Sequence, residues 1–246
     1  MHHFFVAPEN INASQVHFPM DLSHQIKRVL RLRDGDLVNV LDDQGNIFET
    51  QIKILESEVH GEILSRQRSK AEPAVSLSLY IGLTQREKFE WILQKGTEIG
   101  VSRFVPFISE RSLVQKTAAV EKKSQRWQKI IQEAAEQSKR GKIPVLDEAH
   151  SFNQAVENAV DECQICLIPW EETHQNSLKT ALDGTAGGCS SIAVMIGPEG
   201  GFSSDEVHFA TIKGFQAITL GKRILRMETA AVAAAAMILY HLGEME

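Results

Sequence analysis

Short apolar runs alternate with longer amphipathic segments from residue 76 to the end of the chain. The short runs are rich in Ile, Val and Leu, which is typical of buried strands, and the longer segments have helical periodicity. The predicted strands cover 76–82, 104–108, 164–169, 191–196 and 216–220, and the predicted helices cover 86–99, 121–139, 203–213 and 228–242. This alternation favours an α/β fold with a mainly parallel sheet and helices on both faces.

Residues 1–72 have a different pattern, in which β-type segments dominate. We predict a helix over 23–32 and strands over 37–41, 47–55 and 59–64, with 43–46 as a hairpin turn. A polar stretch, 69–73, ends in a proline and predicts a linker. We therefore expect a small β-rich domain over 1–72 and an α/β domain over 73–246.

A glycine-rich segment follows the predicted strand 191–196, namely Ile196-Gly-Pro-Glu-Gly-Gly-Phe-Ser-Ser-Asp-Glu206. Its glycines let a ligand approach the main chain closely. Ser203 and Glu206 have the spacing of a capping box, so a helix is expected to begin there and to end at Gly214. A strand, a glycine loop and a helix N-terminus together favour a site for a polar or anionic group, although a tight turn without a ligand would have the same residues.

Two common nucleotide-binding motifs are excluded. The segment contains no G-x-x-x-x-G-K-[ST] pattern, so it is not a Walker-type phosphate loop. Its spacing is not G-x-G-x-x-G, and residues 198–246 are too few for the remaining strands of a Rossmann domain.

A second segment repeats the strand–loop–helix pattern, namely Leu220-Gly-Lys-Arg-Ile-Leu-Arg-Met-Glu-Thr-Ala230. Alanines give the following helix a high propensity, and its apolar run is shorter than the ~20 residues that a membrane span needs. Arg223 and Arg226 precede this helix. Arginine at such a place can pair with phosphate or stabilise a developing negative charge, although two solvated surface arginines would fit the sequence equally well.

Composition narrows the class of protein. The chain has 246 residues, of which 43% are hydrophobic and three are cysteines. Three cysteines are too few for a disulfide framework, and no secretory signal or lipidation motif is visible, so we expect a soluble cytoplasmic protein. Cys163, Cys166, His174 and Cys189 could be read as zinc ligands. Because Cys163 and Cys166 lie on a predicted strand and should face opposite ways, buried thiols are favoured and no metal is expected.

The charge is acidic overall, with a net value of −6. Residues 1–72 carry 8 Lys and Arg against 11 Asp and Glu, so this block is not a general polyanion binder. Positive charge gathers locally on and after the first predicted helix, at Lys27, Arg28, Arg31 and Arg33. Most such residues are ordinary solvated surface charges, but a few of them aligned on one side would suffice to contact a phosphate backbone, which suits a selective RNA partner.

The two C-terminal segments, with the patterns IGPEGGFSxxE and LGxRILRxETAxxAA, resemble the ribosomal RNA small subunit methyltransferase E family of the SPOUT superfamily. The resemblance extends along nearly the whole chain. Further similar segments begin at His24 (HQIKRVLRLRDGD), Lys95 (KGTEIGV) and Glu133 (EAAEQSKR). Gly96 and Ile99 depart from the family pattern in the second of these.

The resemblance implies a PUA-like RNA-binding barrel over 1–72 and a SPOUT methyltransferase domain with a deep trefoil knot over 73–246. It also implies a homodimer, S-adenosyl-L-methionine as the cofactor, and ribosomal RNA of the small subunit as the partner. The residues that match the family's cofactor positions are Ile168, Pro169, Gly197, Glu199, Gly200, Gly201, Leu220, Gly221, Ile224, Leu225 and Arg226.

The implied reaction is methylation of N3 of a uridine in 16S ribosomal RNA, by a uracil-N3 methyltransferase. Arg226 and Glu228 are the candidate catalytic residues. A guanidinium stays protonated, so Arg226 would stabilise the uridine anion, while Glu228 or Glu199 could accept the proton. Two alternatives remain open at this point: methylation of another RNA position, and an RNA-binding assembly factor without catalysis.

Overall fold

The computed structural model describes residues 1–56, 58–113, 118–174, 176–183 and 188–245. Backbone contacts divide the chain into two compact units. The first unit combines Met1–Glu72 with Ala135–Ile143, and the second combines Pro73–Ala134 with Pro144–Glu246. No described helix is both long and apolar enough to cross a membrane.

The first unit is built on a five-stranded sheet with the order β1-β3-β4-β5-β2. All neighbouring strands are antiparallel except β1 and β3. The strands are β1 (His2–Phe5), β2 (Gln15–Phe18), β3 (Leu37–Leu41), β4 (Asn46–Leu55) and β5 (Glu58–Arg68). Alternate side chains of these strands, such as Phe4, Val16 and Val38, form a buried cluster on one face, as the two-residue period of a strand requires.

The hairpin turn predicted at 43–46 is confirmed between β3 and β4. Asp43 and Gly45 both have positive φ angles, 59° and 87°. One carboxylate oxygen of Asp42 accepts hydrogen bonds from the backbone N–H groups of Gln44 and Asn46. These local contacts explain why the turn could be predicted from its residues alone.

The first helix differs from its predicted bounds of 23–32. It begins at Met20, directly after Pro19, as α1 (Met20–His24), and continues through a wider turn, Gln25–Val29. The chain then leaves the helix at Arg31, whose φ angle is 55°. The helix buries Ile26 in the core formed with the sheet. This tertiary contact decides where the helix lies more strongly than the weak helical periodicity of the segment, from which the bounds were predicted.

The segment Ala135–Ile143 packs on the first unit through polar contacts as well as through Ala135. Glu72 accepts a hydrogen bond from Arg140 Nη2 at 2.8 Å and another from the backbone N–H of Gly141 at 2.9 Å. The backbone N–H of Ile143 donates to Asp43 at 2.6 Å. These partners lie far apart in the sequence, so residue patterns gave no indication of the association.

The second unit is built on a parallel sheet with the order β12-β10-β11-β6-β7-β8, and β9 pairs with β7 off this path. Its strands are β6 (Ser76–Gly82), β7 (Arg103–Ile108), β8 (Val145–Leu146), β9 (His150–Ser151), β10 (Ile165–Pro169), β11 (Ser191–Ile196) and β12 (Gln216–Ile218). Every strand pair in this sheet is parallel, which confirms the α/β fold class.

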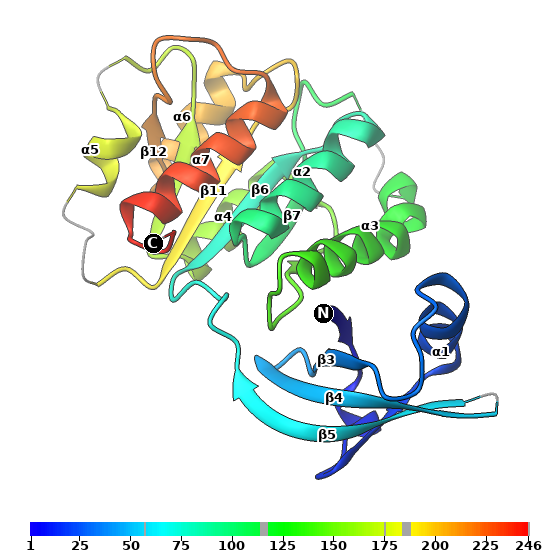
Figure 1. The fold of residues 1–246 in the computed structure, drawn as a ribbon. Helices are drawn as coiled ribbons and strands as arrows, with labels where there is room; N and C mark the ends of the chain where they lie inside the picture. Colours follow the sequence, from blue (N-terminus) through cyan, green and yellow to red (C-terminus); the bar gives the residue numbers. More distant parts are fainter. Residues whose placement is uncertain (57, 114–117, 175, 184–187, 246) are drawn as a thin grey trace. The chain divides into compact units, whose positions relative to one another are not determined.

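Helices cover both faces of this sheet (Figure 1). They are α2 (Arg86–Ile99), α3 (Ala118–Gln137), α4 (Phe152–Glu162), α5 (Leu178–Leu182), α6 (Ser204–Lys213) and α7 (Met227–His241). The pair α2 and α7 packs on one face, and the pair α4 and α6 packs on the other. The predictions did not include α4, α5, β8 and β9.

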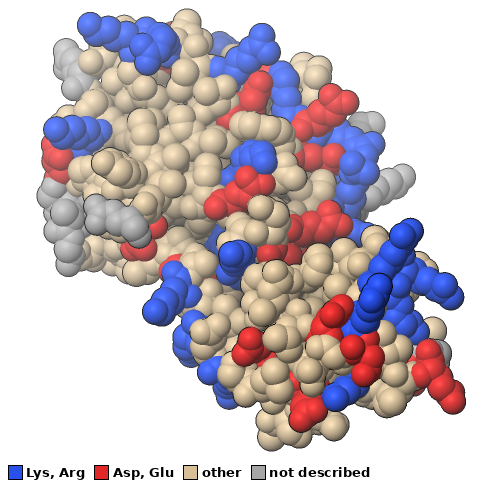
Figure 2. All heavy atoms as spheres, viewed as in Figure 1, with Lys and Arg blue, Asp and Glu red and all other residues tan. Residues whose placement is uncertain are grey.

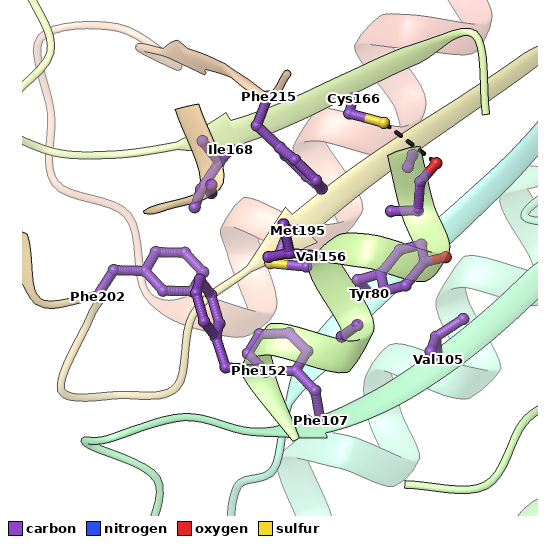
Figure 3. Packing of buried hydrophobic residues seen from close by; sticks show 14 of the residues in the cluster. Tyr80, Val105, Phe107, Phe152, Val156, Cys166, Ile168, Met195, Phe202 and Phe215 are labelled. Atoms are coloured by element: carbon purple, nitrogen blue, oxygen red, sulfur yellow. Dashed lines mark hydrogen bonds between the residues drawn. The ribbon is translucent and has the colours of Figure 1, made fainter. Parts of the chain in front are cut away.

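The main core of the second unit lies between the sheet and the pair α4 and α6. Tyr80 and Phe107 from the sheet meet Phe152 from α4, and Phe202 packs against both Phe107 and Phe152 (Figure 3). The thiol of Cys166 is buried here and donates to the carbonyl of Ala159 at 3.3 Å. The zinc reading of the cysteines therefore has no support among the described residues, where no metal-type cluster contains a cysteine.

Candidate functional site

A cavity of about 430 Å³ opens at the carboxyl ends of β10 and β11. This is where ligands bind in open α/β sheets. Its lining comes from four segments: one residue of α2, the end of β10 with Glu171 just after it, the end of β11 with the loop that follows, and the loop that leads into α7 with the start of that helix. The lining residues are Lys88, Pro169, Glu171, Ile196, Gly197, Pro198, Glu199, Gly200, Gly201, Phe202, Ile224, Leu225, Arg226, Met227, Glu228 and Ala230.

The loop after β11, residues 197–203, is called the glycine loop. Gly201 has a φ angle of 68°, and its N–H donates to the carbonyl of Pro198 at 2.9 Å, which closes a tight turn. The loop ends in the predicted capping box, in which Ser203 and Glu206 exchange hydrogen bonds at the start of α6. Backbone groups of the glycine loop therefore stand at a helix N-terminus beside the cavity, which suits a polar or anionic ligand.

The glycine loop packs closely on neighbouring elements. A Cβ at Gly82, the last residue of β6, would lie 2.7 Å from the backbone nitrogen of Pro198. A Cβ at Gly201 would lie 3.0 Å from the carboxylate of Glu171, which follows β10. These distances leave no room for a side chain at Gly82 unless the glycine loop moves.

Arg111 fixes the glycine loop from the segment after β7. Its Nη1 donates to the carbonyl oxygens of Gly200 and Phe202, both at 3.1 Å. The backbone N–H of Glu110 donates to the capping carboxylate of Glu206 at 2.9 Å. Two hydrogen bonds from one guanidinium nitrogen hold both carbonyls in place and so fix the course of the glycine loop.

Glu199 is held by residues of a third segment. Its Oε1 accepts hydrogen bonds from Thr84, after β6, and from Lys88 Nζ in the first turn of α2, the latter at 3.1 Å. Partial burial alone would raise the pKa of Glu199, but the bonds from Thr84, from its own backbone N–H and from Lys88 together lower the pKa below its ordinary value. Glu199 is therefore an ionised, paired carboxylate at neutral pH.

The loop that leads into α7, residues 219–226, is called the second loop. Its fixed part is a local turn in which Thr219 Oγ1 accepts from the N–H of Gly221 and donates to its carbonyl, both at 3.1 Å. β12 ends at Ile218, two residues before its predicted end, because Thr219 enters this turn. Ile224 is 88% exposed, and the side chain of Arg226 is exposed as well.

The second loop separates the large cavity from a smaller one of about 170 Å³. Both cavities share Pro169, Glu171, Ile224, Leu225 and Ala230. The smaller cavity also has Trp170, His174, Thr219, Leu220, Gly221, Lys222 and Arg223 in its lining. One ligand with two parts could therefore occupy both spaces on either side of the second loop.

Glu228, in the first turn of α7, lines the large cavity. Its Oε2 is buried and has no hydrogen-bond partner among the described residues. An unpartnered buried carboxylate oxygen is costly, so a ligand that brings a hydrogen-bond donor to this atom would be favoured.

The structure brings most of the predicted site residues together. Pro169, Gly197, Glu199, Gly200, Gly201, Ile224, Leu225, Arg226 and Glu228 line the large cavity, and Leu220 and Gly221 line the smaller one. Ile168 is fully buried in the core and lines neither. Sequence analysis did not identify Thr84, Lys88 or Arg111, which reach the site from distant segments, and it did not assign a site role to Glu171, which follows the predicted Pro169 by two residues.

The four basic residues proposed for RNA lie in the first unit. Lys27 is half-buried and donates to the carbonyl of Glu56 at 3.4 Å, whereas Arg28, Arg31 and Arg33 are exposed. Figure 2 shows Lys and Arg side chains gathered over the part of this unit that carries α1. Their placement is compatible with contact to a phosphate backbone.

A family model described as an RNA methyltransferase domain matches residues 71–239. The ribosomal RNA small subunit methyltransferase E of Synechocystis sp. is 35% identical, over 95% of this chain and 75% of its own length. The protein of the same name from Bacillus subtilis is 32% identical, over 88% of this chain and 86% of its own length.

Solved structures agree with these matches. The ribosomal RNA small subunit methyltransferase E of Neisseria gonorrhoeae, bound to S-adenosyl methionine, has a TM-score of 0.87 and 31% identity over 98% of each chain. A putative methyltransferase of Legionella pneumophila, also in complex with that cofactor, has a TM-score of 0.86 and 26% identity over 97% of each chain. The chain thus belongs to the ribosomal RNA small subunit methyltransferase E family.

Proposed function

We propose that this protein uses S-adenosylmethionine to methylate N3 of a uridine in 16S ribosomal RNA. One observation supports this most directly: the glycine loop, Arg226 and Glu228, a carboxylate with one buried and unpartnered oxygen, line one cavity. The neighbours from Neisseria gonorrhoeae and Legionella pneumophila are described with this cofactor bound, which supports the same ligand here.

The cavities suit such a cofactor. Backbone groups of the glycine loop and the second loop, with the apolar side chains of Leu220 and Leu225, would hold the adenosine part. Gly197, Gly200 and Gly201 carry no side chains of their own, so a ligand could approach the main chain of the glycine loop closely. When bound, the cofactor supplies a methyl group on a positively charged sulfur, which is already activated for transfer.

The protein must align the acceptor and help N3 lose its proton, because a neutral uridine is a poor nucleophile at this atom. In the reaction the N3 lone pair forms a bond to the methyl carbon and the carbon–sulfur bond breaks. Arg226 would stabilise the negative charge that develops on the base, at the mouth of the cavity where its side chain is exposed.

Glu228 is the better candidate to take the N3 proton. Glu228 lines the cavity and its buried Oε2 has no hydrogen-bond partner among the described residues, whereas Glu199 is engaged by Thr84 and Lys88 and has a lowered pKa. A carboxylate with a lowered pKa is a weaker base. N3 lies on the pairing edge of uracil, so the base must be unpaired or extruded to reach this oxygen.

Three further features complete the proposal. The first unit is a PUA-like domain that binds the RNA through Arg28, Arg31, Arg33 and Lys27. The second unit is a SPOUT domain with a trefoil knot that is formed around the cofactor loops. Two chains form a homodimer in the cytoplasm. Each of these follows from the family resemblance, and the local basic charge of the first unit supports the RNA contact.

The test is methyl transfer from labelled S-adenosylmethionine to small subunits from cells that lack this enzyme, followed by mass spectrometry of the nucleosides. We expect label in 3-methyluridine. Label in another nucleoside would overturn the acceptor atom and keep the cofactor. Absence of both transfer and cofactor binding would leave a non-catalytic RNA-binding protein.

A second experiment tests the role of Glu228 by substitution. Glu228→Gln keeps the shape of the side chain and removes the basic oxygen, so we expect kcat to fall by about a hundredfold. A higher pH, which deprotonates uridine N3 without a catalyst, should restore part of the lost rate. A loss that stays the same at every pH would contradict proton transfer to Glu228.

A further inference from the structure

We propose that the first unit binds a divalent transition-metal ion of the zinc type through His17, Glu58 and His60. One ligand atom from each residue lies within 4.8 Å of the other two. Two imidazoles and a carboxylate are ligands that zinc prefers. The site lies on the sheet of the first unit and does not depend on the proposed methyl transfer.

Strand geometry explains why the three side chains meet. His17 on β2 and His60 on β5 are directly paired across an antiparallel ladder, so both point to the same face. Glu58 precedes His60 by two residues on β5 and shares this face. The two imidazole rings have a centroid separation of 4.9 Å.

This face is turned away from the core of the first unit. Val16 and Val59, which alternate with the three candidate ligands, are fully buried on the opposite face. His17 and Glu58 are exposed and His60 is half-buried, so an ion could enter from solvent while the backbone of two paired strands holds the ligands.

The distances suit a metal after small side-chain rotations. Glu58 Oε2 and His60 Nε2 are 3.0 Å apart, which is a hydrogen-bond distance. With metal–ligand bonds of about 2.0–2.1 Å, two ligand atoms of a tetrahedral zinc ion lie roughly 3.3 Å apart. A metal ion would therefore take the place of this hydrogen bond, and His17 would complete a set of three protein ligands with water in the fourth position.

The positive charge of the neighbouring Lys53 does not strongly oppose binding of a metal ion. Lys53 on β4 is paired with His60 and lies on the same face. Its ammonium group is 3.8 Å from Glu62, the next residue of β5 on this face, which offsets its charge. The charge of Lys53 is thus opposed by Glu62 as well as by Glu58 of the cluster itself.

The expected consequence is a link between an edge strand and the interior of the sheet. β2 is at the end of the strand order, and its neighbour in the sheet is β5. A metal bound to both strands stabilises the folded first unit, because it binds that state in preference to the unfolded chain. The thermal midpoint of the protein should rise accordingly.

The test uses the full chain, freed of metal by a chelator. Zinc binding is measured by calorimetry and by the shift of the thermal midpoint, and cobalt is added as a coloured probe of the ligands. We expect one equivalent of zinc to bind, and a cobalt spectrum without a thiolate charge-transfer band. His17→Ala and His60→Ala should each weaken zinc binding about tenfold or more, and Glu58→Gln should weaken it as well.

His24→Ala is the matched control, because His24 is an exposed histidine of the same unit outside the cluster. This variant should bind zinc as the parent does. Unchanged zinc binding in His17→Ala and His60→Ala would overturn the proposal. A thiolate band with cobalt would assign the metal to the cysteines instead, and absence of any zinc binding would also overturn it.

Discussion

The glycine loop and the second loop occupy equivalent places in the fold but are held very differently. Each follows a parallel strand, precedes a helix and lines the large cavity. Side chains from three other segments, namely Thr84 with Lys88, Arg111 and Glu171, lie against the glycine loop. The second loop is fixed at its start by Thr219 and leaves Ile224 largely exposed.

This difference indicates separate tasks. A loop that is already ordered loses little conformational entropy when a ligand binds, so the glycine loop is suited to be a preformed binding site. A loop with few contacts can adjust to its ligand, and ordering it is part of the cost of binding. We infer that the glycine loop sets cofactor affinity, while the second loop and the start of α7 carry the groups that act in the reaction.

The largest expected effect tests whether the second loop carries a group that acts in the reaction. Arg226→Ala removes the exposed guanidinium and leaves the backbone of the second loop in place. If Arg226 stabilises developing charge, kcat should fall roughly 10²–10³-fold, whereas the Kd for S-adenosylmethionine should change by less than about threefold. Single-turnover kinetics and calorimetry measure the two quantities.

Arg223→Ala is the matched control for that experiment. Arg223 is exposed in the same loop and lines only the smaller cavity. The kcat of this variant at saturating S-adenosylmethionine should stay close to that of the parent protein, whatever its effect on cofactor affinity. Near-normal turnover in Arg226→Ala, or equal losses in both variants, would contradict a specific role for Arg226.

The next largest effect tests whether the glycine loop is a preformed binding site for the cofactor. Gly82→Ala would place a Cβ 2.7 Å from the backbone nitrogen of Pro198, so the glycine loop must move. Overpacking of this kind costs about 1–3 kcal/mol, and we expect cofactor affinity to fall by about tenfold or more. Gly188→Ala is the control, since a Cβ there meets nothing within 4 Å. Similar cofactor affinity in both variants would show that the glycine loop is not a rigid, preformed binding site.

A smaller effect is expected for Arg111→Ala, which removes two hydrogen bonds to carbonyls of the glycine loop. We expect the Kd for the cofactor to rise about tenfold or less, with kcat at saturation nearly unchanged. Hydrogen exchange in residues 197–203 should become faster. The exposed Arg86, which pairs with Glu90 in α2, provides the control variant Arg86→Ala. A fall in kcat without a change in Kd would contradict a positioning role.

The contrast between local contacts and contacts from distant segments also explains which features could be predicted from the sequence. The capping box of Ser203 and Glu206 and the turn at Asp43 and Gly45 depend on residues close in sequence, and both predictions are confirmed. The contacts of Arg111 and Lys88 with the glycine loop join residues about 90 and 110 positions apart in sequence, so no local pattern contains them. The glycines were visible in the sequence, whereas the groups that fix them were not.

The smallest expected effect concerns the pair of Lys88 and Glu199, which also holds the glycine loop. Because the pKa of Glu199 is lowered in the fold, its contribution to stability is fully present above the ordinary pKa of about 4.3 and is lost only as the pH falls through the lower, folded value. Lys88→Met should therefore reduce the free energy of unfolding by at most about 1 kcal/mol. This difference from the parent protein should stay constant from pH 7 down to about pH 4.5. Urea unfolding at several pH values measures it, and a difference that has already halved at pH 5 would show that Lys88 does not hold Glu199 in its ionised form.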